Sequence, residues 1–308
     1  MNLFGIENSD LKFKNGYKSV DAEFIKSCDA DLEKKLAEGV SEFCRKKDAR
    51  VLGVTGPTCS GKTTAAKKLT AYLGDESKRV IPISLDDFFK DTFSREMLKD
   101  ADITKLDFDS PDTIDIDLFA EFIENIFNKG EAKKPIFDFT TGTRAVWENV
   151  VCDDDDILLL EGIQVLYPSI MAVTDRFDVS VMGVRVESGI EICDRKFAPD
   201  FIRFCRRLVR DFNFRASDTD LTWGLWNSVT ENERLNILPY MSKCDVCIDT
   251  TLPYELNVLA PYLRNILKDI PSEKTYYKDA MDMLMAIDGI DGIDSKVISD
   301  NSLYKEFV

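Results

Sequence analysis

Apolar residues along this chain follow two spacings, one typical of amphipathic helices and the other of buried β-strands. Helices are predicted where apolar residues recur every three or four positions, as in 21–47, 64–73, 118–127 and 254–268. Short apolar runs of strand length alternate with these helices. The alternation predicts an α/β fold built on a doubly wound, mainly parallel five-stranded sheet. The five predicted strands are 51–55, 79–85, 157–160, 177–186 and 244–250.

The same pattern divides the chain into three parts. We expect an N-terminal extension over residues 1–49, a main domain over residues 50–270 and a helical C-terminal tail over residues 271–308. Within the main domain, residues 135–144 predict an extended segment or one arm of a hairpin. The extension is dominated by one long amphipathic helix, whose predicted buried face consists of Phe24, Cys28, Leu32, Leu36, Val40 and Phe43.

The turn between the first predicted strand and its helix carries a motif with a chemical meaning. It matches the pattern G-x-x-x-x-G-K-[ST], in which backbone N–H groups and the positive end of a helix dipole surround phosphate groups. We therefore expect it to bind a nucleoside triphosphate, with Lys62 on the β- and γ-phosphates and the Thr63 hydroxyl on Mg²⁺. The residues of this loop are Gly56, Pro57, Thr58, Cys59, Ser60, Gly61, Lys62, Thr63 and Thr64.

Acidic residues follow two of the predicted strands, at the edge where ligands bind in sheets of this kind. Glu161 follows the strand 157–160, and its carboxylate is expected near the Mg²⁺ ion. Asp86 directly follows the strand 79–85 and is the candidate general base for an acceptor hydroxyl. Asp87 is expected to point away, because side chains alternate along an extended chain. Since the chain contains no histidine, carboxylates are the remaining candidates for the base.

The net charge of the chain limits the classes of partner that it is expected to bind. A net charge of −16 argues against nucleic acid or an anionic membrane as the main partner. Against this background, a mostly helical insert between the last two predicted strands contains five arginines: Arg203, Arg206, Arg207, Arg210 and Arg215. Their spacing places several of them on one helical face, which favours the binding of a polyanion. The alternative is a solvated face whose arginines pair with the many carboxylates of the chain.

Composition indicates a globular protein of the cytoplasm. Hydrophobic residues make up 44% of the 308 residues and charged residues 31%. No apolar run approaches the roughly 18 residues of a membrane span, and no signal peptide is recognisable. The eight cysteines are therefore expected to be free thiols. Cys244 and Cys247 form a C-x-x-C pair, for which a structural role is favoured over a redox pair or a metal site.

Several segments together resemble the uridine kinase and phosphoribulokinase family of P-loop kinases. In the order of the family, they are 56–64, 84–89, 108–112, 135–139 with Arg144, 160–163 and 207–211. The resemblance implies the fold of P-loop NTPases, a kinase domain over residues 50–270, ATP and Mg²⁺ as cofactors, and an arginine-rich helical lid. Further segments are similar to a bacterial branch called uridine kinase-like: 208–215, 226–229, 237–240 and 300–307.

The resemblance also implies roles for single residues. Asp86 would be the base, Lys62 and Thr63 would act at the phosphates and Mg²⁺, and Glu161 would lie near the metal. Asp109 would hold sugar hydroxyls of the acceptor. The remaining implied residues are Phe137 and Arg144 at the acceptor, and the lid arginines Arg207, Arg210 and Arg215.

The chain departs from the better-known members of the family at three positions. Phe137 stands where they have Tyr, Gly142 where they have a base-reading His, and Ser217 where they have a further lid Arg. The first two changes remove hydrogen-bonding groups that would recognise a pyrimidine, and such groups can discriminate strongly. A phosphoryl transfer is therefore better supported than uridine as its acceptor.

The leading hypothesis is an ATP- and Mg²⁺-dependent kinase whose acceptor is a hydroxyl of a small molecule, with a nucleoside as the first candidate. Sugar phosphates, pantothenate and glycerate stay open as acceptors, and so does assembly with further copies of the chain. A nucleotide-binding regulator without catalysis is the alternative from another class, although a mere binder has no need of a base such as Asp86. A GTPase is disfavoured because no Asp-x-x-Gly switch follows the third predicted strand.

Overall fold

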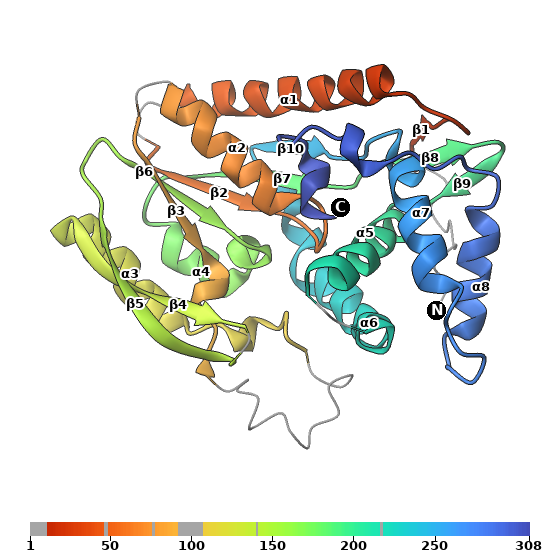
Figure 1. The fold of residues 1–308 in the computed structure, drawn as a ribbon. Helices are drawn as coiled ribbons and strands as arrows, with labels where there is room; N and C mark the ends of the chain where they lie inside the picture. The colour runs from red at the N-terminus through yellow and green to blue at the C-terminus, as the bar shows by residue number, and fades with distance from the viewer. Residues whose placement is uncertain (1–10, 46–48, 76–77, 92–106, 140, 216–217) are drawn as a thin grey trace.

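The fold centres on a five-stranded sheet in which all neighbouring strands are parallel (Figure 1). The computed structural model describes the chain apart from residues 1–10, 46–48, 76–77, 92–106, 140 and 216–217. All five predicted strands are present, in the order β10-β7-β2-β6-β3 across the sheet. Their bounds are β2 Val51–Thr55, β3 Val80–Ser84, β6 Ile157–Glu161, β7 Val179–Arg185 and β10 Val246–Asp249.

Helices cover both faces of the sheet because its central strands are apolar throughout. Successive residues of a strand point to opposite faces, so Leu52 and Leu159 belong to one hydrophobic cluster, and Val51 and Leu158 to another. This two-sided burial confirms the doubly wound fold (Figure 1). The first cluster includes α1 (Ala22–Cys44) and α2 (Lys62–Asp75), and the second includes α3 (Ile116–Lys129) and α4 (Pro168–Thr174).

The register of the strands aligns the ends that carry the candidate site. Glu161, at the end of β6, lies beside Val54 of β2 and Ser84 of β3. Three turns therefore leave the sheet at the same edge, where ligands bind in open α/β sheets. They are the phosphate loop after β2, the 3₁₀ turn η1 (Leu85–Phe88) after β3 and the 3₁₀ turn η5 (Ile163–Leu166) after β6.

The long N-terminal helix is confirmed as α1. It begins after Asp21, whose carboxylate accepts a hydrogen bond of 2.8 Å from the backbone N–H of Phe24. Its apolar face packs on α2. Phe24 is only half-buried, and Ile25 is the first fully buried residue of the helix. The predicted stripe otherwise agrees with the buried residues.

Two smaller sheets flank the central one. The predicted extended segment, residues 135–144, contains the end of β4 (Glu131–Asp138) and the start of β5 (Thr143–Val151), which pair as an antiparallel hairpin longer than the sequence pattern indicated. A three-stranded sheet was not predicted at all, and its strands are only three or four residues long. It consists of β1 (Phe13–Asn15), β8 (Gly189–Ile192) and β9 (Arg195–Phe197).

The second half of the chain is mainly helical. Helix α5 contains two arginines of the predicted lid, Arg207 and Arg210, with Arg215 as its C-cap, and it packs on α6 and α7. The helices are α5 (Pro199–Phe214), α6 (Thr219–Asn236), α7 (Glu255–Leu267) and α8 (Tyr277–Ala286). Further 3₁₀ turns are η4 (Pro111–Thr113), η6 (Leu238–Lys243), η7 (Ser295–Val297) and η8 (Leu303–Glu306).

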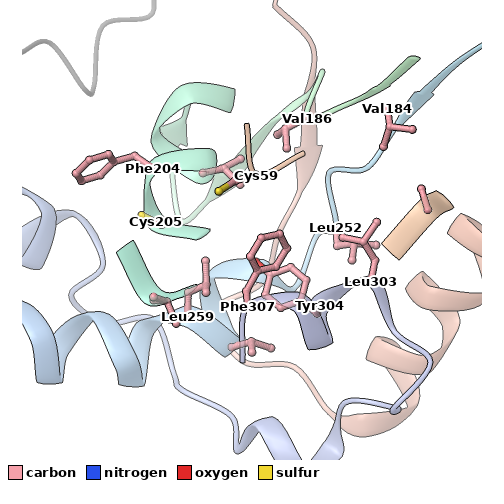
Figure 2. Packing of buried hydrophobic residues seen from close by; sticks show 14 of the residues in the cluster. Cys59, Val184, Val186, Phe204, Cys205, Leu252, Leu259, Leu303, Tyr304 and Phe307 are labelled. Atoms are coloured by element: carbon pink, nitrogen blue, oxygen red, sulfur yellow. The ribbon is translucent and has the colours of Figure 1, made fainter. Parts of the chain in front are cut away.

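The three predicted parts of the chain share one hydrophobic cluster. Leu303, Tyr304 and Phe307 pack near Cys59 of the phosphate loop (Figure 2). The buried face of α1 belongs to the same cluster. The division at residues 49 and 270 stays a prediction, and these packing contacts run across it.

The remaining general expectations concern thiols and membranes. All eight cysteines, each within the described part of the chain, are free thiols. Cys244 and Cys247 lie together over Gly183, where an added Cβ would come within 3.0 Å of either sulfur. A search of the described residues found no helix long and apolar enough to cross a membrane.

Candidate active site

The phosphate loop has a backbone that only certain residues allow. Gly56 has a φ of 152°, and a Cβ there would lie 1.8 Å from the carbonyl oxygen of Val184. Gly61 has a φ of 92°, and a Cβ there would lie 2.5 Å from the side chain of Leu303. Both glycines are therefore needed for the loop to pass so close to its neighbours. Cys59 has a φ of 60° and is the one residue of the loop that adopts a left-handed conformation without being a glycine.

The loop is suited to hold phosphate groups. It leads directly into α2, whose first N–H groups have no partner within the helix. The Ser60 hydroxyl is buried and has no hydrogen-bond partner in the described structure. The Lys62 ammonium lies back over the loop and donates a hydrogen bond of 3.0 Å to the carbonyl oxygen of Pro57. Unsatisfied donors and a buried cation thus surround the space in which a phosphate would be bound.

Thr63 and Glu161 meet as the sequence predicts for a Mg²⁺ site. The Thr63 hydroxyl donates a hydrogen bond of 3.4 Å to Oε1 of Glu161. Burial raises the pKa of Glu161 to about 7, against an opposing effect of Lys62. No group of three or more acidic or cysteine residues able to hold a metal occurs among the described residues. Mg²⁺ commonly takes one or two carboxylates together with phosphate oxygens and water, so these two residues fit it.

Asp86 and Asp87 diverge as expected, but the reason is different: both lie in the 3₁₀ turn η1, where successive side chains are about 120° apart, and not in an extended strand. Asp86 accepts a hydrogen bond of 2.8 Å from Nε2 of Gln164 in η5. Burial raises the pKa of Asp86, and the nearby charges of Lys62 and Arg215 oppose this rise. Asp87 instead forms an ion pair of 2.5 Å with Lys134 of the hairpin. Asp86 therefore lies with the phosphate loop, and Asp87 holds β4.

Asp109 lies near enough to Asp86 for the two carboxylates to interact electrostatically. Burial raises the pKa of Asp109 to about 6, with Arg207 opposing the rise and Asp86 adding to it. The hydroxyl of Tyr167 donates a hydrogen bond of 2.5 Å to the backbone carbonyl of Asp109, and Asn232 donates one of 2.8 Å to that hydroxyl. The two predicted acceptor carboxylates, Asp86 and Asp109, are thus electrostatic neighbours.

Gln164 and Tyr167 are functional candidates that the sequence reading missed. Gln164 is buried with its Oε1 unpartnered in the described structure, beside the carboxylate of Asp86. Tyr167 has no exposed surface. The available signal was a polar side chain inside the apolar stretch that follows Glu161, because buried polar groups are retained where they have a partner or a ligand.

Two arginines of α5 support the back of the phosphate loop. Arg203 forms an ion pair of 2.7 Å with Glu233 of α6 and donates to the carbonyl of Thr58 at 3.2 Å. Glu233 also accepts from the backbone N–H of Thr58 at 2.8 Å. Arg206 donates to the carbonyl of Cys59 at 3.2 Å. Arg203 and Arg206 are buried, so they lie neither on a face open to a polyanion nor on a solvated face, the two alternatives that the sequence left open.

The three arginines assigned to the lid gather around one carboxylate, Asp211. Arg210 lies 2.8 Å from it, Arg207 3.4 Å and Arg215 3.8 Å. The Nε atom of Arg207 is buried and makes no hydrogen bond in the described structure. Arg207 also acts on the charge of Asp109, and Arg215 on that of Asp86, so these arginines lie beside the two acceptor carboxylates. Arg207, Arg210 and Arg215 therefore lie close together, as the sequence predicts.

The hairpin carries the last two predicted residues. Phe137 is buried in β4, with its ring 5.4 Å from that of Phe89. Arg144 of β5 forms ion pairs with Asp115 at 2.8 Å and Asp91 at 3.4 Å. No contact of the described residues brings Arg144 to Asp86 or Asp109. Arg144 links the hairpin to the start of α3, where Asp115 is the N-cap.

Comparisons with known proteins show the family of the chain. The model of the phosphoribulokinase / uridine kinase family matches residues 51–255. Over 166 residues the chain is 29% identical to a uridine kinase of Leuconostoc citreum (strain KM20), covering 54% of this chain and 70% of that protein. Over 238 residues it is 27% identical to uridine-cytidine kinase A of Dictyostelium discoideum, covering 76% of this chain and 43% of that protein.

Similar solved structures share little sequence with the chain. One described as a possible uridine kinase from Bacillus stearothermophilus has a TM-score of 0.46 at 18% identity, covering 71% of this chain and all of that one (100%). Phosphoribulokinase from Rhodobacter spheroides has a TM-score of 0.45 at 13% identity, covering 78% of this chain and 96% of that one.

Proposed function

Because the chain belongs to the phosphoribulokinase/uridine kinase family, we propose that it is a kinase that transfers the γ-phosphoryl group of ATP to a hydroxyl of a small molecule. The observation that carries this proposal is the position of Asp86. Its carboxylate lies in η1, just after β3, accepts a hydrogen bond from Gln164 and is electrostatically close to Lys62. A base at this position would face both the phosphate loop and the acceptor.

The residues of the site divide into a donor side and an acceptor side. On the donor side, the loop and Lys62 would hold the triphosphate, and Thr63 with Glu161 would hold Mg²⁺. When bound, Mg²⁺ would supply neutralisation of the negative charge on the phosphate oxygens.

On the acceptor side, Asp86 would accept the proton of the attacking hydroxyl, and Asp109 would position the acceptor by hydrogen bonds. Arg207, Arg210 and Arg215 would stabilise the charge of the transferring group.

We propose a nucleoside as the first candidate acceptor. The names of the similar curated proteins support it, and so does a carboxylate, Asp109, that could bind vicinal hydroxyls. Phe137 offers an aromatic face without a hydrogen-bonding group, and Gly142 offers no side chain. Recognition of a particular base by these two positions is therefore limited to shape and stacking.

The test measures ATP consumption with a panel of acceptors: nucleosides, sugar phosphates, pantothenate and glycerate. The proposal expects phosphorylation of at least one of them, with a nucleoside the best. If the purified protein binds ATP but phosphorylates none of these acceptors, the hypothesis of a nucleotide-binding regulator replaces the proposal of a kinase.

A variant tests the assignment of the base. Asp86→Asn should lower kcat by about 10²–10⁴-fold while the affinity for ATP is largely kept, because the carboxylate acts on the acceptor proton. Asp87→Asn is the matched control for charge and should affect the stability of the hairpin rather than turnover. Undiminished turnover of Asp86→Asn would rule out the proposed mechanism.

A further inference from the structure

Residues 302–308, which we call the 302–308 segment, lie against the phosphate loop although they follow it by some 240 positions in the chain (Figure 2). Leu303 fills the space beside Gly61, and it is the side chain that a Cβ on Gly61 would strike. Leu303, Tyr304 and Phe307 are each at most 1% exposed. The segment is therefore packed into the fold rather than laid on its surface.

Polar contacts tie the 302–308 segment to the back of the loop. The Tyr304 hydroxyl donates a hydrogen bond of 2.8 Å to Glu255, which forms the ion pair with Arg206. The guanidinium group of Arg206 lies 5.3 Å from the ring centroid of Phe307. Because Arg206 also binds the carbonyl of Cys59, the segment and the loop share one buried support.

One side chain of the segment reaches the nucleotide side of the loop. Oε2 of Glu306 accepts a hydrogen bond of 3.1 Å from the hydroxyl of Thr64, in the first turn of α2. Glu306 also contributes to raising the pKa of Glu161 and of Arg210, so its charge is felt across the site. Arg210 balances that charge, which allows a carboxylate to stay beside a polyphosphate.

The position and chemistry of Glu306 indicate which part of a nucleotide it would contact. The triphosphate lies along the loop and the first turn of α2, and the group that follows its α-phosphate is the ribose. An ionised carboxylate only accepts hydrogen bonds, and phosphate oxygens at neutral pH offer it no donor. The ribose hydroxyls do, and acidic side chains bind them in this way in dinucleotide sites.

We infer that the 302–308 segment forms the ribose side of the donor-nucleotide site, with the Glu306 carboxylate accepting hydrogen bonds from the ribose hydroxyls. Glu306 is then a specificity-determining residue that favours ribonucleotides over deoxyribonucleotides. This inference rests on the proposed function only in so far as ATP occupies the loop, and it does not depend on which acceptor is phosphorylated.

The experiment compares the binding of four probes by calorimetry: ATP, 2′-deoxy-ATP, 3′-deoxy-ATP and inorganic tripolyphosphate. The wild-type protein should bind ATP about tenfold or more tightly than at least one deoxy analogue, as expected for a hydrogen bond to a charged group. Glu306→Ala should lose that preference, while its affinity for tripolyphosphate is kept or rises, because a negative charge beside the phosphates is removed. Glu231→Gln, an exposed carboxylate of α6, is the matched control and should keep the preference.

Three results would overturn the inference. Equal affinity of the wild-type protein for ATP and both deoxy analogues would remove any role in reading ribose. A Glu306→Ala variant that loses tripolyphosphate as much as ATP would show that Glu306 orders the loop instead. A wild-type protein that binds neither ATP nor tripolyphosphate would overturn both this inference and the proposed function. If the protein discriminates ATP from its deoxy analogues but phosphorylates no acceptor, the inference about Glu306 holds and the proposed function is wrong. A thermal unfolding midpoint for each variant shows that the fold is kept.

Discussion

Arg206 and Glu255 form an ion pair whose two side chains have no exposed surface. A pair of this kind adds little net stability, because removing two charges from water offsets most of their attraction. Its effect is on geometry: Nη1 of Arg206 fixes the carbonyl of Cys59, the loop residue in the left-handed conformation. The strained turn of the phosphate loop is thus held from behind by a group that touches no ligand.

Asp109 gives the first prediction at the residue scale. Burial raises the pKa of Asp109 from 3.8 to about 6. The protonated form therefore favours folding below pH 3.8, and this contribution is lost as the pH rises through 6. Asp109→Asn should raise the free energy of unfolding by about 1–2 kcal/mol at pH 7, and by almost nothing near pH 3.8, since half-burial moderates the effect.

Denaturant unfolding of the wild type and Asp109→Asn at both pH values measures this difference. Asp269→Asn, at an exposed position, is the control and should change stability equally little at either pH. The same Asp109 variant should weaken acceptor binding. An Asp109→Asn protein with unchanged stability at pH 7 would show that burial does not destabilise the ionised form of Asp109.

Single residues were predictable where local spacing alone determines their position. Gly56 directly follows β2, Asp86 lies two residues beyond β3, and Glu161 is the last residue of β6, so all three lie near the strand ends where the pattern predicts them. The surroundings of the arginines could not be predicted in this way. Glu233 lies 30 positions from its partner Arg203, and Glu255 lies 49 positions from Arg206. Spacing along one helix shows which side chains share a face, but not what that face packs against.

At the scale of elements, the helices and central strands were the most predictable features. Their hydrophobic periods extend over many residues, as in α1, and their burial is decided by the same residues. The sheet of β1, β8 and β9 was missed because its strands are three or four residues long and Phe13 pairs with Gly189. Such short pairings depend on tertiary context rather than on a local pattern.

Helix α1 carries a prediction of its own. Leu36 has no exposed surface and lies in the cluster that α1 shares with α2. Leu36→Ala should lower the free energy of unfolding by about 2–5 kcal/mol, because it leaves a cavity in that cluster. Lys35→Ala, one position away on the exposed face, should change it by less than about 0.5 kcal/mol. Chemical denaturation measures both, and a negligible effect of Leu36→Ala would mean that α1 is only loosely attached.

At the scale of the whole molecule, one cluster joins α1, the phosphate loop and the 302–308 segment. The chain should therefore unfold in a single cooperative transition, with no separate melting of residues 1–49 or 271–308. Calorimetry tests this by comparing the calorimetric enthalpy with the van't Hoff enthalpy. A second, earlier transition would favour the division that the sequence pattern suggests.

That joint packing was also beyond the reach of the sequence pattern. The pattern of predicted helices and strands indicates a division near residues 49 and 270, but the contact between Leu303 and Gly61 is visible only in three dimensions. The candidate site was predicted in outline from strand ends, because parallel strands bring their carboxyl ends together. The residues that support the phosphate loop from behind come from segments distant in the chain, so this part of the site could not be predicted from the sequence.

The three arginines that share Asp211 have a consequence for how fast a nucleotide arrives. At a distance, an ATP anion meets a protein of net charge −16 and is repelled, whereas within the site it meets three neighbouring guanidinium groups. Salt screens charges separated by more than about 8 Å at physiological ionic strength and affects the close contacts much less. Moderate salt should thus remove the barrier to encounter before it weakens the capture, so that the association rate passes through a maximum as ionic strength rises.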